Sequence, residues 1–317
     1  MAADWVEEGN AARRPADAPA RLPGEVAART AGTADGTEPE RQAITRRLHR
    51  VLVDHAYGVG RDAWAAAVPD LRAAWENHKN RYPERLRPTP VTTADGSWVA
   101  GPHRRLSPEQ NAEASKACAD IADEGRRDIL PALKRVESAE AGRHLAGLKN
   151  MLKGENRLKE KIAERLLAKP DRTVQQVISA VSDPVRFTFC YSPQRYADSV
   201  RADVERLKAE GFELTKLKNQ WSDEQYKGIN SQWRRPETGL RVEVQFHTAE
   251  SLEAKELTHE AYERIRGSAA SPAERRELEA FQRQANTFLV TPEGTEAIRN
   301  YPEKRNDRKD HLLCDRR

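Results

Sequence analysis

The sequence predicts an α+β fold, in which strands and helices alternate from residue 152 onward. The run 185–191, Val-Arg-Phe-Thr-Phe-Cys-Tyr, alternates large β-branched and aromatic residues with smaller or polar ones, as strands do. The run 242–246, Val-Glu-Val-Gln-Phe, alternates apolar and polar residues and predicts a second strand. Between residues 152 and 185, the capping box Thr173-Val174-Gln175-Gln176 starts a helix.

The N-terminal third of the sequence differs from this pattern. Residues 1–40 are rich in Ala, Pro, Gly, Arg and acidic residues without periodicity, and they predict a disordered leader. Apolar residues then recur at helical spacings until a group of prolines ends the pattern, so residues 41–105 predict a small helical module and linker of unknown role. Residues 106–290 are expected to form the sheet domain with flanking helices, and residues 291–317 a basic tail.

Further helix boundaries follow from capping residues. Ser107 precedes Pro108 and Gln110, which is the pattern of an N-cap with proline in the first turn. A helix starts at Ser192-Pro193 and closes at Gly211 as its C′ residue. Residues 248–266 predict a helix with Lys255, His259 and Tyr262 on one face, and a last helix starts at Ser271.

Composition bounds the class of protein. The chain of 317 residues is 38% hydrophobic and 33% charged, as in highly charged globular proteins, and no apolar run is long enough to span a membrane. Its net charge of +4 comes from 54 basic and 50 acidic residues, which is no nucleic-acid-binding signature by itself. The acidic N-terminus predicts a cytoplasmic protein without a signal peptide, although delivery by a specialised secretion route stays open.

Paired carboxylates predict where the chemistry lies. Glu243 and Gln245 project from one face of their strand, and a plain solvated face is the alternative interpretation of this pair alone. Asp183 lies just before the predicted strand 185–191 and supplies a second carboxylate. Because Mg²⁺ is usually held by one or two carboxylates plus substrate phosphates, the two acids predict a Mg-nucleotide site.

A family resemblance sharpens this prediction. Matching segments occur in the order and approximate spacing of the RelA/SpoT-like synthetase domain: Asp183 with its strand, Lys218-Asn219-Gln220-Trp221, the run 228–233, Glu243-Val244-Gln245 and His259. The chain resembles this family over residues 145–266. The resemblance implies a mixed β-sheet, nucleotidyltransferase-like synthetase domain flanked by helices. Family members transfer the β,γ-pyrophosphate of ATP to the 3′-hydroxyl of an acceptor nucleotide and so make alarmones.

The resemblance also implies roles for the ATP side of the site. Asp183 and Glu243 would hold Mg²⁺, Glu243 would take the proton of the acceptor hydroxyl, and Gln245 would orient that hydroxyl or the metal shell. Lys153 and Lys161 would contact the ATP phosphates, with Arg157 as a weaker candidate. The alternative is that these basic residues form the solvated face of an amphipathic helix.

The acceptor side departs from the family pattern. Lys218, Asn230 and His247 are the expected acceptor-binding residues, with His247 standing where the family has arginine. Ile229 replaces the tyrosine that stacks on the acceptor base, so adenine and guanine acceptors are expected to react within about tenfold of each other. Arg186 lies two places nearer to the aspartate than the family's arginine.

Aromatic and histidine side chains nearby leave alternatives open. Trp221 and Trp233 could stack on a base or pack in the core. The spacing of His247 and His259 fits no zinc site, which favours hydrogen-bonding or core roles.

The predicted function is therefore ATP-dependent pyrophosphate transfer to a purine nucleotide. A catalytically impaired nucleotide-binding or interaction module, and a toxin that pyrophosphorylates a tRNA end, are the alternatives. The N-terminal half lies outside the family resemblance, and it could bind an immunity or regulatory protein. No membrane partner is expected.

Overall fold

The computed structural model describes residues 37–83, 88–267 and 270–302. Most of the expected leader and the end of the expected basic tail lie outside these residues. The helices and strands in chain order are α3 (Glu38–Arg81), β1 (Val91–Thr92), β2 (Trp98–Val99), β3 (Arg105–Leu106), α4 (Pro108–Glu124), a π-helical turn (Gly125–Ile129), α5 (Leu130–Ser138), β4 (Arg143–Ala146), α6 (Glu155–Ala168), α7 (Val174–Ser179), β5 (Val185–Tyr191), α8 (Tyr196–Ala209), β6 (Glu213–Asn219), β7 (Ile229–Arg234), β8 (Arg241–Thr248), α9 (Ala249–Arg266) and α10 (Pro272–Thr287), with 3₁₀ turns at Leu148–Asn150, Pro193–Arg195 and Thr295–Ala297.

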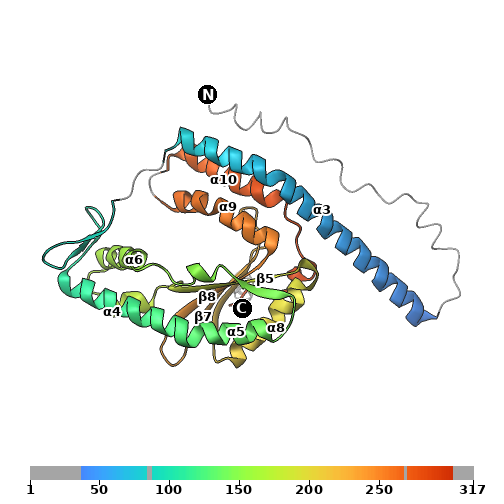
Figure 1. Cartoon of the computed structure of the whole chain (residues 1–317), viewed down its shortest axis with the longest axis horizontal. Helices are drawn as coiled ribbons and strands as arrows, with labels where there is room; N and C mark the ends of the chain where they lie inside the picture. The colour runs from blue at the N-terminus through green and yellow to red at the C-terminus, as the bar shows by residue number, and fades with distance from the viewer. Residues whose placement is uncertain (1–36, 84–87, 268–269, 303–317) are drawn as a thin grey trace, which may run out of the picture.

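A mixed five-stranded sheet lies at the centre of the molecule, with helices around it (Figure 1). Its strand order is β4-β5-β8-β7-β6, in which β5 and β8 are parallel and the other neighbouring pairs are antiparallel. The α+β prediction is confirmed, and both strands predicted from alternation, β5 and β8, occupy the middle of the sheet. Their position explains why β5 is buried along most of its length.

The main core fills one face of this sheet. Large side chains from the strands, among them Phe187, Phe189, Trp233, Val244 and Phe246, pack there against α5 and α8. These strand residues are at most 1% exposed, so the space between the sheet and the two helices is a closed apolar core. The polar residues that alternate with them therefore share the opposite face of the sheet.

A second cluster lies beside the sheet. The short strands β1 to β3 form a small antiparallel sheet, and Trp98 and Leu106 from it pack with Ile162 of α6. Helices α4 and α7 complete this cluster. Helix α6 is thus fixed on its apolar side by a core that is separate from the main one.

A third cluster joins both ends of the described chain. Helix α3 runs 44 residues, and its C-terminal half packs along α9 and α10 through Trp64, Leu71 and Trp75 (Figure 1). The expected helical module is thus a single long helix. Its N-terminal end projects beyond the rest of the molecule, while farther along the helix Tyr57 is buried and His49 Nε2 lies 2.7 Å from Glu293 Oε1.

The predicted helix boundaries agree with the structure. Ser107 and Thr173 form reciprocal capping boxes, and Ser271 caps α10. Gly211 adopts φ +84° directly after α8, which is the left-handed conformation expected of a C′ glycine.

Part of the expected tail belongs to the sheet domain. Tyr301 forms a two-way backbone bridge with Leu217 of β6, at 2.8 and 2.9 Å. No helix in the described parts of the chain is long and apolar enough to cross a membrane.

Candidate active site

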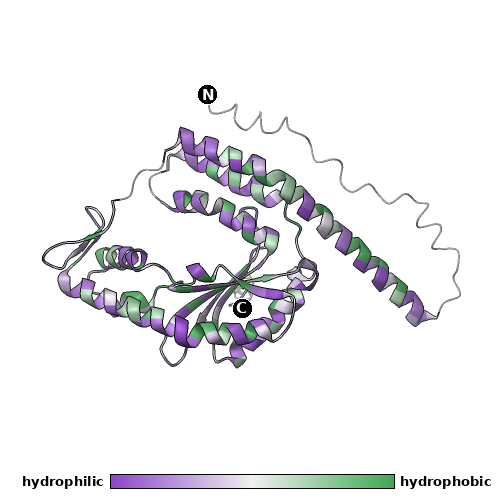
Figure 2. Cartoon of the chain, viewed as in Figure 1, coloured by the Kyte–Doolittle hydropathy of each residue, from purple (hydrophilic) through white to green (hydrophobic). Residues whose placement is uncertain are grey.

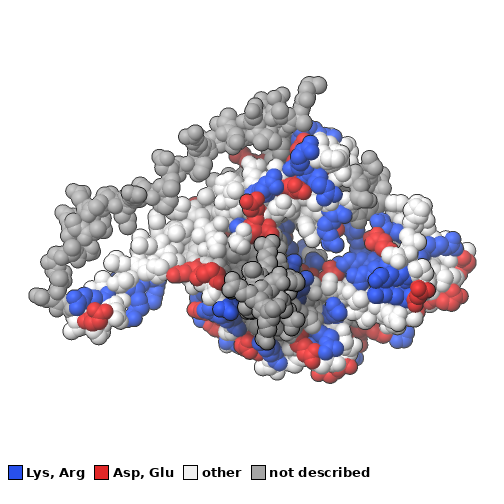
Figure 3. Space-filling view, turned by 180° about the vertical axis from the view of Figure 1, so that it is seen from behind, with Lys and Arg blue, Asp and Glu red and all other residues white. Residues whose placement is uncertain are grey.

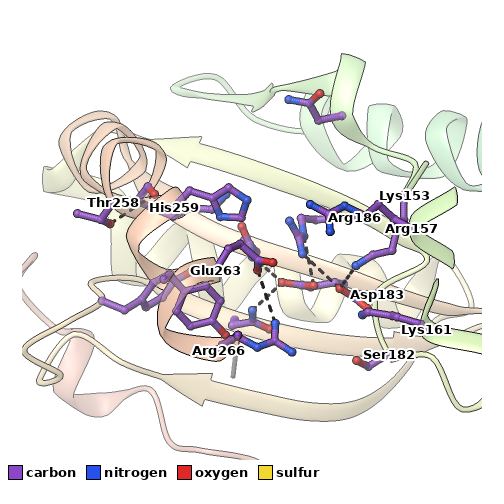
Figure 4. Close-up of a pocket in the computed structure, with 18 of the residues that line it drawn as sticks. Lys153, Arg157, Lys161, Ser182, Asp183, Arg186, Thr258, His259, Glu263 and Arg266 are labelled. Carbon is purple, nitrogen blue, oxygen red and sulfur yellow. Dashed lines mark hydrogen bonds and ion pairs between the residues drawn. The ribbon is translucent and has the colours of Figure 1, made fainter. Parts of the chain in front are cut away.

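A cleft of about 920 Å³ opens on the polar face of the sheet. Residues from the α6 segment line one wall and residues from α9 line the other (Figure 4). The floor consists of polar side chains of β5, β7 and β8. Lys and Arg side chains gather around a hollow on the side of the molecule seen in Figure 3.

Strand register brings the floor residues together. Arg186 of β5 lies opposite Glu243 of β8, and Asn230 of β7 lies opposite Gln245. Glu243 Oε1 accepts hydrogen bonds from Asn230 Nδ2 at 2.7 Å and from Gln245 Nε2 at 2.5 Å. Thr188 Oγ1 lies 3.5 Å from Gln245 Oε1 and extends the network along β5.

These floor residues are not a solvated surface. Glu243 is 6% exposed and Gln245 is 4% exposed, although both belong to the polar face. Buried polar groups are stable only when they are hydrogen-bonded, and here each has a partner from another strand or from its own. The interpretation of the alternating pattern as a plain solvated face is therefore wrong.

Asp183 precedes β5 and joins the floor to the α6 wall. Its Oδ2 accepts a hydrogen bond from Lys153 Nζ at 2.5 Å, and its Oδ1 accepts one from Lys161 Nζ at 2.7 Å. Burial by itself would raise the pKa of the Asp183 carboxyl, but the two lysine hydrogen bonds outweigh burial and lower the pKa to about 2. Asp183 is thus a carboxylate throughout the physiological range.

The basic residues of the α6 segment face the cleft to different degrees. The side chains of Lys153 and Lys161 are 19% and 28% exposed and both line the cleft, which contradicts the solvated-face alternative for these two. Arg157 also lines the cleft, but its side chain is 54% exposed and pairs with Glu160. Burial lowers the pKa of the Lys153 ammonium, and Asp183 opposes this effect.

Arg186 links the two carboxylates. Its Nη2 lies 3.4 Å from Asp183 Oδ2 and its Nε lies 3.2 Å from Glu243 Oε2 (Figure 4). The displaced arginine was not among the predicted site residues. Arg186 and Thr188 are two residues apart, so they lie on the same face of β5. Pairing of β5 with β8 then places Arg186 on the same face of the sheet as Glu243.

The α9 wall adds groups that the sequence placed on one face without assigning them a role. Lys255, His259 and Tyr262 all line the cleft, as their spacing predicts. Burial lowers the pKa of the Lys255 ammonium, and the nearby Arg186 lowers it further. Lys255 therefore adds a basic side chain to the cleft from the α9 wall, near the carboxylates of the floor.

Three of the four predicted acceptor residues, Lys218, Ile229 and His247, do not line the cleft, and Asn230 does. Ile229 is fully buried in the main core, because Asn230 takes the cleft side of β7 and its neighbour must point the other way. The prediction that Ile229 packs on an acceptor base is therefore wrong. Lys218 lies opposite Asn230 but is exposed at the outer strand β6, outside the cleft lining.

The tryptophans proposed as alternative stacking residues are core residues. Trp221 is 3% exposed and Trp233 is 0% exposed, and both belong to the main apolar cluster. Tyr226 and Tyr262 are aromatic side chains that do line the cleft.

His247 lies behind Tyr226 and does not line the cleft itself. Its Nε2 is 2.9 Å from the Tyr226 hydroxyl, and its Nδ1 is 2.9 Å from Ser251 Oγ. Burial, helped by the charge of Lys255, lowers the pKa of His247 to about 3, so the ring is neutral at physiological pH. The structure assigns His247 to holding Tyr226, and this replaces the predicted direct contact with an acceptor.

Gly228 allows this packing. It adopts φ +149°, and a Cβ there would lie 2.7 Å from His247 Cε1 and 3.1 Å from the Phe246 carbonyl oxygen. A side chain at this position would clash with the His247 ring and with the Phe246 carbonyl oxygen.

The donor set is compatible with Mg²⁺. Asp183 and Glu243 offer carboxylate oxygens, the ligand class that Mg²⁺ prefers. The described residues contain no larger group, of three or more His, Cys, Asp or Glu side chains, that could hold a metal ion by itself. Mg²⁺ normally keeps waters and substrate phosphates as its remaining ligands, so two carboxylates suffice. Arg186 contacts one oxygen of each and would have to share them with the ion.

Comparison with known proteins gives low similarities. No protein-family model and no curated protein matches the chain. Among solved structures, a GTP pyrophosphokinase family protein from Streptococcus pneumoniae is 16% identical, with a TM-score of 0.35 over 56% of this chain and 87% of that chain. Small alarmone synthetase 2 from Bacillus subtilis is 15% identical, with a TM-score of 0.37 over 56% and 91% of the two chains.

A third structure is small alarmone synthetase 1 from Bacillus subtilis bound to its product pppGpp. It is 14% identical, with a TM-score of 0.33 over 56% of this chain and 87% of that chain. By name these three proteins are pyrophosphokinases or alarmone synthetases, as are members of the family that the sequence motifs resemble. Similarities of this size carry no further argument about the chemistry of this chain.

Proposed function

We propose that the protein transfers the β,γ-pyrophosphate of ATP to the 3′-hydroxyl of a purine nucleotide. The observation that supports this best is the pair of carboxylates, Asp183 and Glu243, set in a cleft whose walls carry Lys153, Lys161 and Lys255. Carboxylates among cations suit a metal-bound polyphosphate better than an apolar or neutral ligand. The order of the sequence motifs supports the same reaction.

The residues of the α6 segment would bind ATP. Lys153 and Lys161 now neutralise Asp183, and on binding they would turn to the phosphate oxygens while Asp183 and Glu243 hold Mg²⁺. The ion would neutralise charge on the transferred group. Arg157, at the open end of this wall, would contact the phosphates as a solvated cation.

Glu243 would serve as the general base. The acceptor 3′-oxygen attacks the β-phosphorus of ATP, the bond from that phosphorus to the oxygen shared with the α-phosphate breaks, and AMP leaves. The proton of the hydroxyl passes to Glu243, which Gln245 and Asn230 hold in place through hydrogen bonds to Oε1. Positioning and electrostatics would carry most of the rate enhancement.

Product analysis tests this proposal. The purified chain is incubated with Mg-ATP and one acceptor in each reaction: AMP, GMP, GDP, GTP or tRNA. The products are resolved by chromatography. A pyrophosphorylated nucleotide and an equal amount of AMP are expected, and Glu243→Gln, which keeps the side-chain volume, should abolish both. Transfer to tRNA alone would favour the toxin alternative. Nucleotide binding without any product would favour the impaired binding module.

A further inference from the structure

An apolar stripe on helix α3 is left without a partner among the described residues. Ile44, Leu48, Val51, Leu52 and Val59 are 58%, 49%, 58%, 50% and 55% exposed. Ile44, Leu48, Val51 and Leu52 are linked by three- and four-residue steps, and Val59 lies two helical turns beyond Leu52, so all five lie on one helix face. Monomeric proteins rarely keep such a continuous apolar surface in water unless it binds something.

The stripe is not the face that α3 uses within the chain. Trp64, Leu71 and Trp75 bury the opposite side of the helix against α9 and α10. At about 100° per residue, these positions lie roughly half a turn away from Leu48 and Val59. The N-terminal end of α3 projects beyond the other elements, and green apolar bands run along the helix (Figures 1 and 2). The residues of this half that do contact the body, His49 and Tyr57, lie outside the stripe. The stripe is therefore accessible to another molecule.

Charges beside the stripe indicate which molecule. Glu40, Arg47, Asp54 and Arg61 recur every seven residues along one flank, with alternating sign. Two such helices placed antiparallel, with their Leu48 and Val51 layers in contact, bring Arg47 next to Asp54 of the partner subunit. The same arrangement brings Glu40 next to Arg61 of the partner subunit. The flank is complementary to itself.

The opposite orientation lacks this complementarity. In a parallel pair, the charged flank of one helix meets the opposite edge of its partner's stripe, formed by Leu52 and Val59 with Thr45 beside them. Charged residues would then face apolar ones without ionic partners. Arg47 and Asp54 make no ion pair within the described parts of the chain, so their pairing with each other across the interface costs no existing salt bridge, whereas Arg61 would share its contact with Asp62.

We propose that the stripe of α3 binds the same stripe of a second copy of this chain, and that the two helices pair antiparallel in a symmetric dimer. Each copy contributes the same patch, as in an isologous interface. The bodies of the two subunits lie on opposite sides of the helix pair, because each body packs on the face of α3 turned away from the stripe. The cleft of each subunit stays open.

Analytical ultracentrifugation of the full chain over a range of concentrations tests the dimer. The expected species has twice the chain mass of 35.8 kDa. Leu48→Glu, which puts a charge in the middle of the stripe, should give a monomer. Leu167→Glu on α6 is the matched control, because Leu167 is 63% exposed away from the stripe, and it should leave the dimer unchanged.

Charge exchange tests the orientation. Arg47→Asp and Asp54→Arg each create two like-charge pairs in the antiparallel dimer, so each alone should raise the dissociation constant at least about tenfold. An equimolar mixture of the two variants should dimerise again, since every pair across the interface is then opposite in sign. Arg46→Asp, on the far side of the helix, is the control that should not matter.

Four outcomes would overturn the proposal: a wild-type chain that is monomeric at all concentrations, a dimer that resists Leu48→Glu, single exchanges without effect, or a mixture that stays monomeric. A monomer would mean that residues 1–36 or a different partner covers the stripe. Circular dichroism checks that each variant keeps the helix content of the wild type.

Discussion

At the scale of single residues, Arg186 holds two carboxylates with one guanidinium, through Nη2 to Asp183 and Nε to Glu243. A lysine has one compact ammonium and cannot span both positions, so Arg and Lys are not interchangeable here. Losing the bridge removes the ion pair of Glu243, since Arg186 is its one salt-bridge partner among the described residues and Lys255 acts on it only as a nearby charge.

Arg186→Lys should therefore lower the free energy of unfolding by about 1–3 kcal/mol, the usual cost of an unsatisfied hydrogen-bonding group. Urea unfolding measures this change. Arg157→Lys is the matched control, because Arg157 is 54% exposed with one surface partner, and it should change stability by less than about 0.5 kcal/mol. Equal stabilities of Arg186→Lys and the wild type would show that the bridge does not contribute.

His247 predicts a pH dependence. Its ordinary pKa of 6.5 falls to about 3 in the folded chain, so between these values the unfolded chain binds a proton that the folded chain does not. The unfolding free energy should thus fall as the pH drops below about 6.5, by up to about 1.4 kcal/mol for each pH unit. Lowering of the Asp183 pKa from 3.8 to about 2 stabilises the fold above that range, and this contribution is lost only as the pH falls from about 4 toward 2.

Urea unfolding at several pH values between 7 and 5 isolates the histidine contribution. His247→Gln should reduce the slope of stability against pH, because glutamine keeps a hydrogen-bonding side chain without titrating. All other ionisable groups are common to the two proteins, so their contributions cancel in the comparison. Parallel curves for variant and wild type would mean that His247 has the same pKa in the folded and the unfolded chain.

At the scale of elements, the start of β7 carries a tight contact between the strand and the β8–α9 junction. Gly228→Ala should lower the unfolding free energy by more than the roughly 1–2 kcal/mol typical of a left-handed alanine, because its Cβ would also meet the His247 ring. Gly239 separates the two effects, since it has φ +74° and no atom within 4 Å of its Cβ position. Urea unfolding of both variants should rank Gly228→Ala as the more damaging, and the reverse order would show that the His247 contact relaxes freely.

At the scale of the whole molecule, the two walls of the cleft belong to different apolar clusters. The α6 wall is held by the cluster of Trp98 and Ile162, and the α9 wall by the cluster of Leu71 and Trp75 on α3. A change on α3 should therefore reach the cleft through α9 and through α10, which contributes Gln282 to the lining, and not through α6.

Leu71→Ala should lower the free energy of unfolding by about 2–5 kcal/mol, because Leu71 is 2% exposed in the third cluster. Amide hydrogen exchange should become faster in α9 while α6 keeps its protection. Leu167→Ala, at a 63% exposed position, is the control and should leave both helices as they are. Equal acceleration in α6 and α9 would show that the clusters open together.

Much of the fold follows from local sequence patterns. Alternation predicted β5 and β8, and capping residues such as Ser107, Thr173 and Ser271 predicted helix starts, because these signals act over a few residues and need no distant partner. The two carboxylates, and Lys153 and Lys161 beside them, were also found from motif order, and the structure places all four at one cleft.

What the sequence alone could not determine is which side of each strand faces the cleft and which long side chains meet there. Ile229 was expected to face an acceptor and lies in the core, because pairing of β7 with β8 turns Asn230 toward Glu243. Arg186 reaches both carboxylates only because parallel pairing puts β5 in register with β8. Local patterns determine that a strand or helix forms, whereas strand pairing and packing between segments far apart in the chain determine which of its side chains become the site.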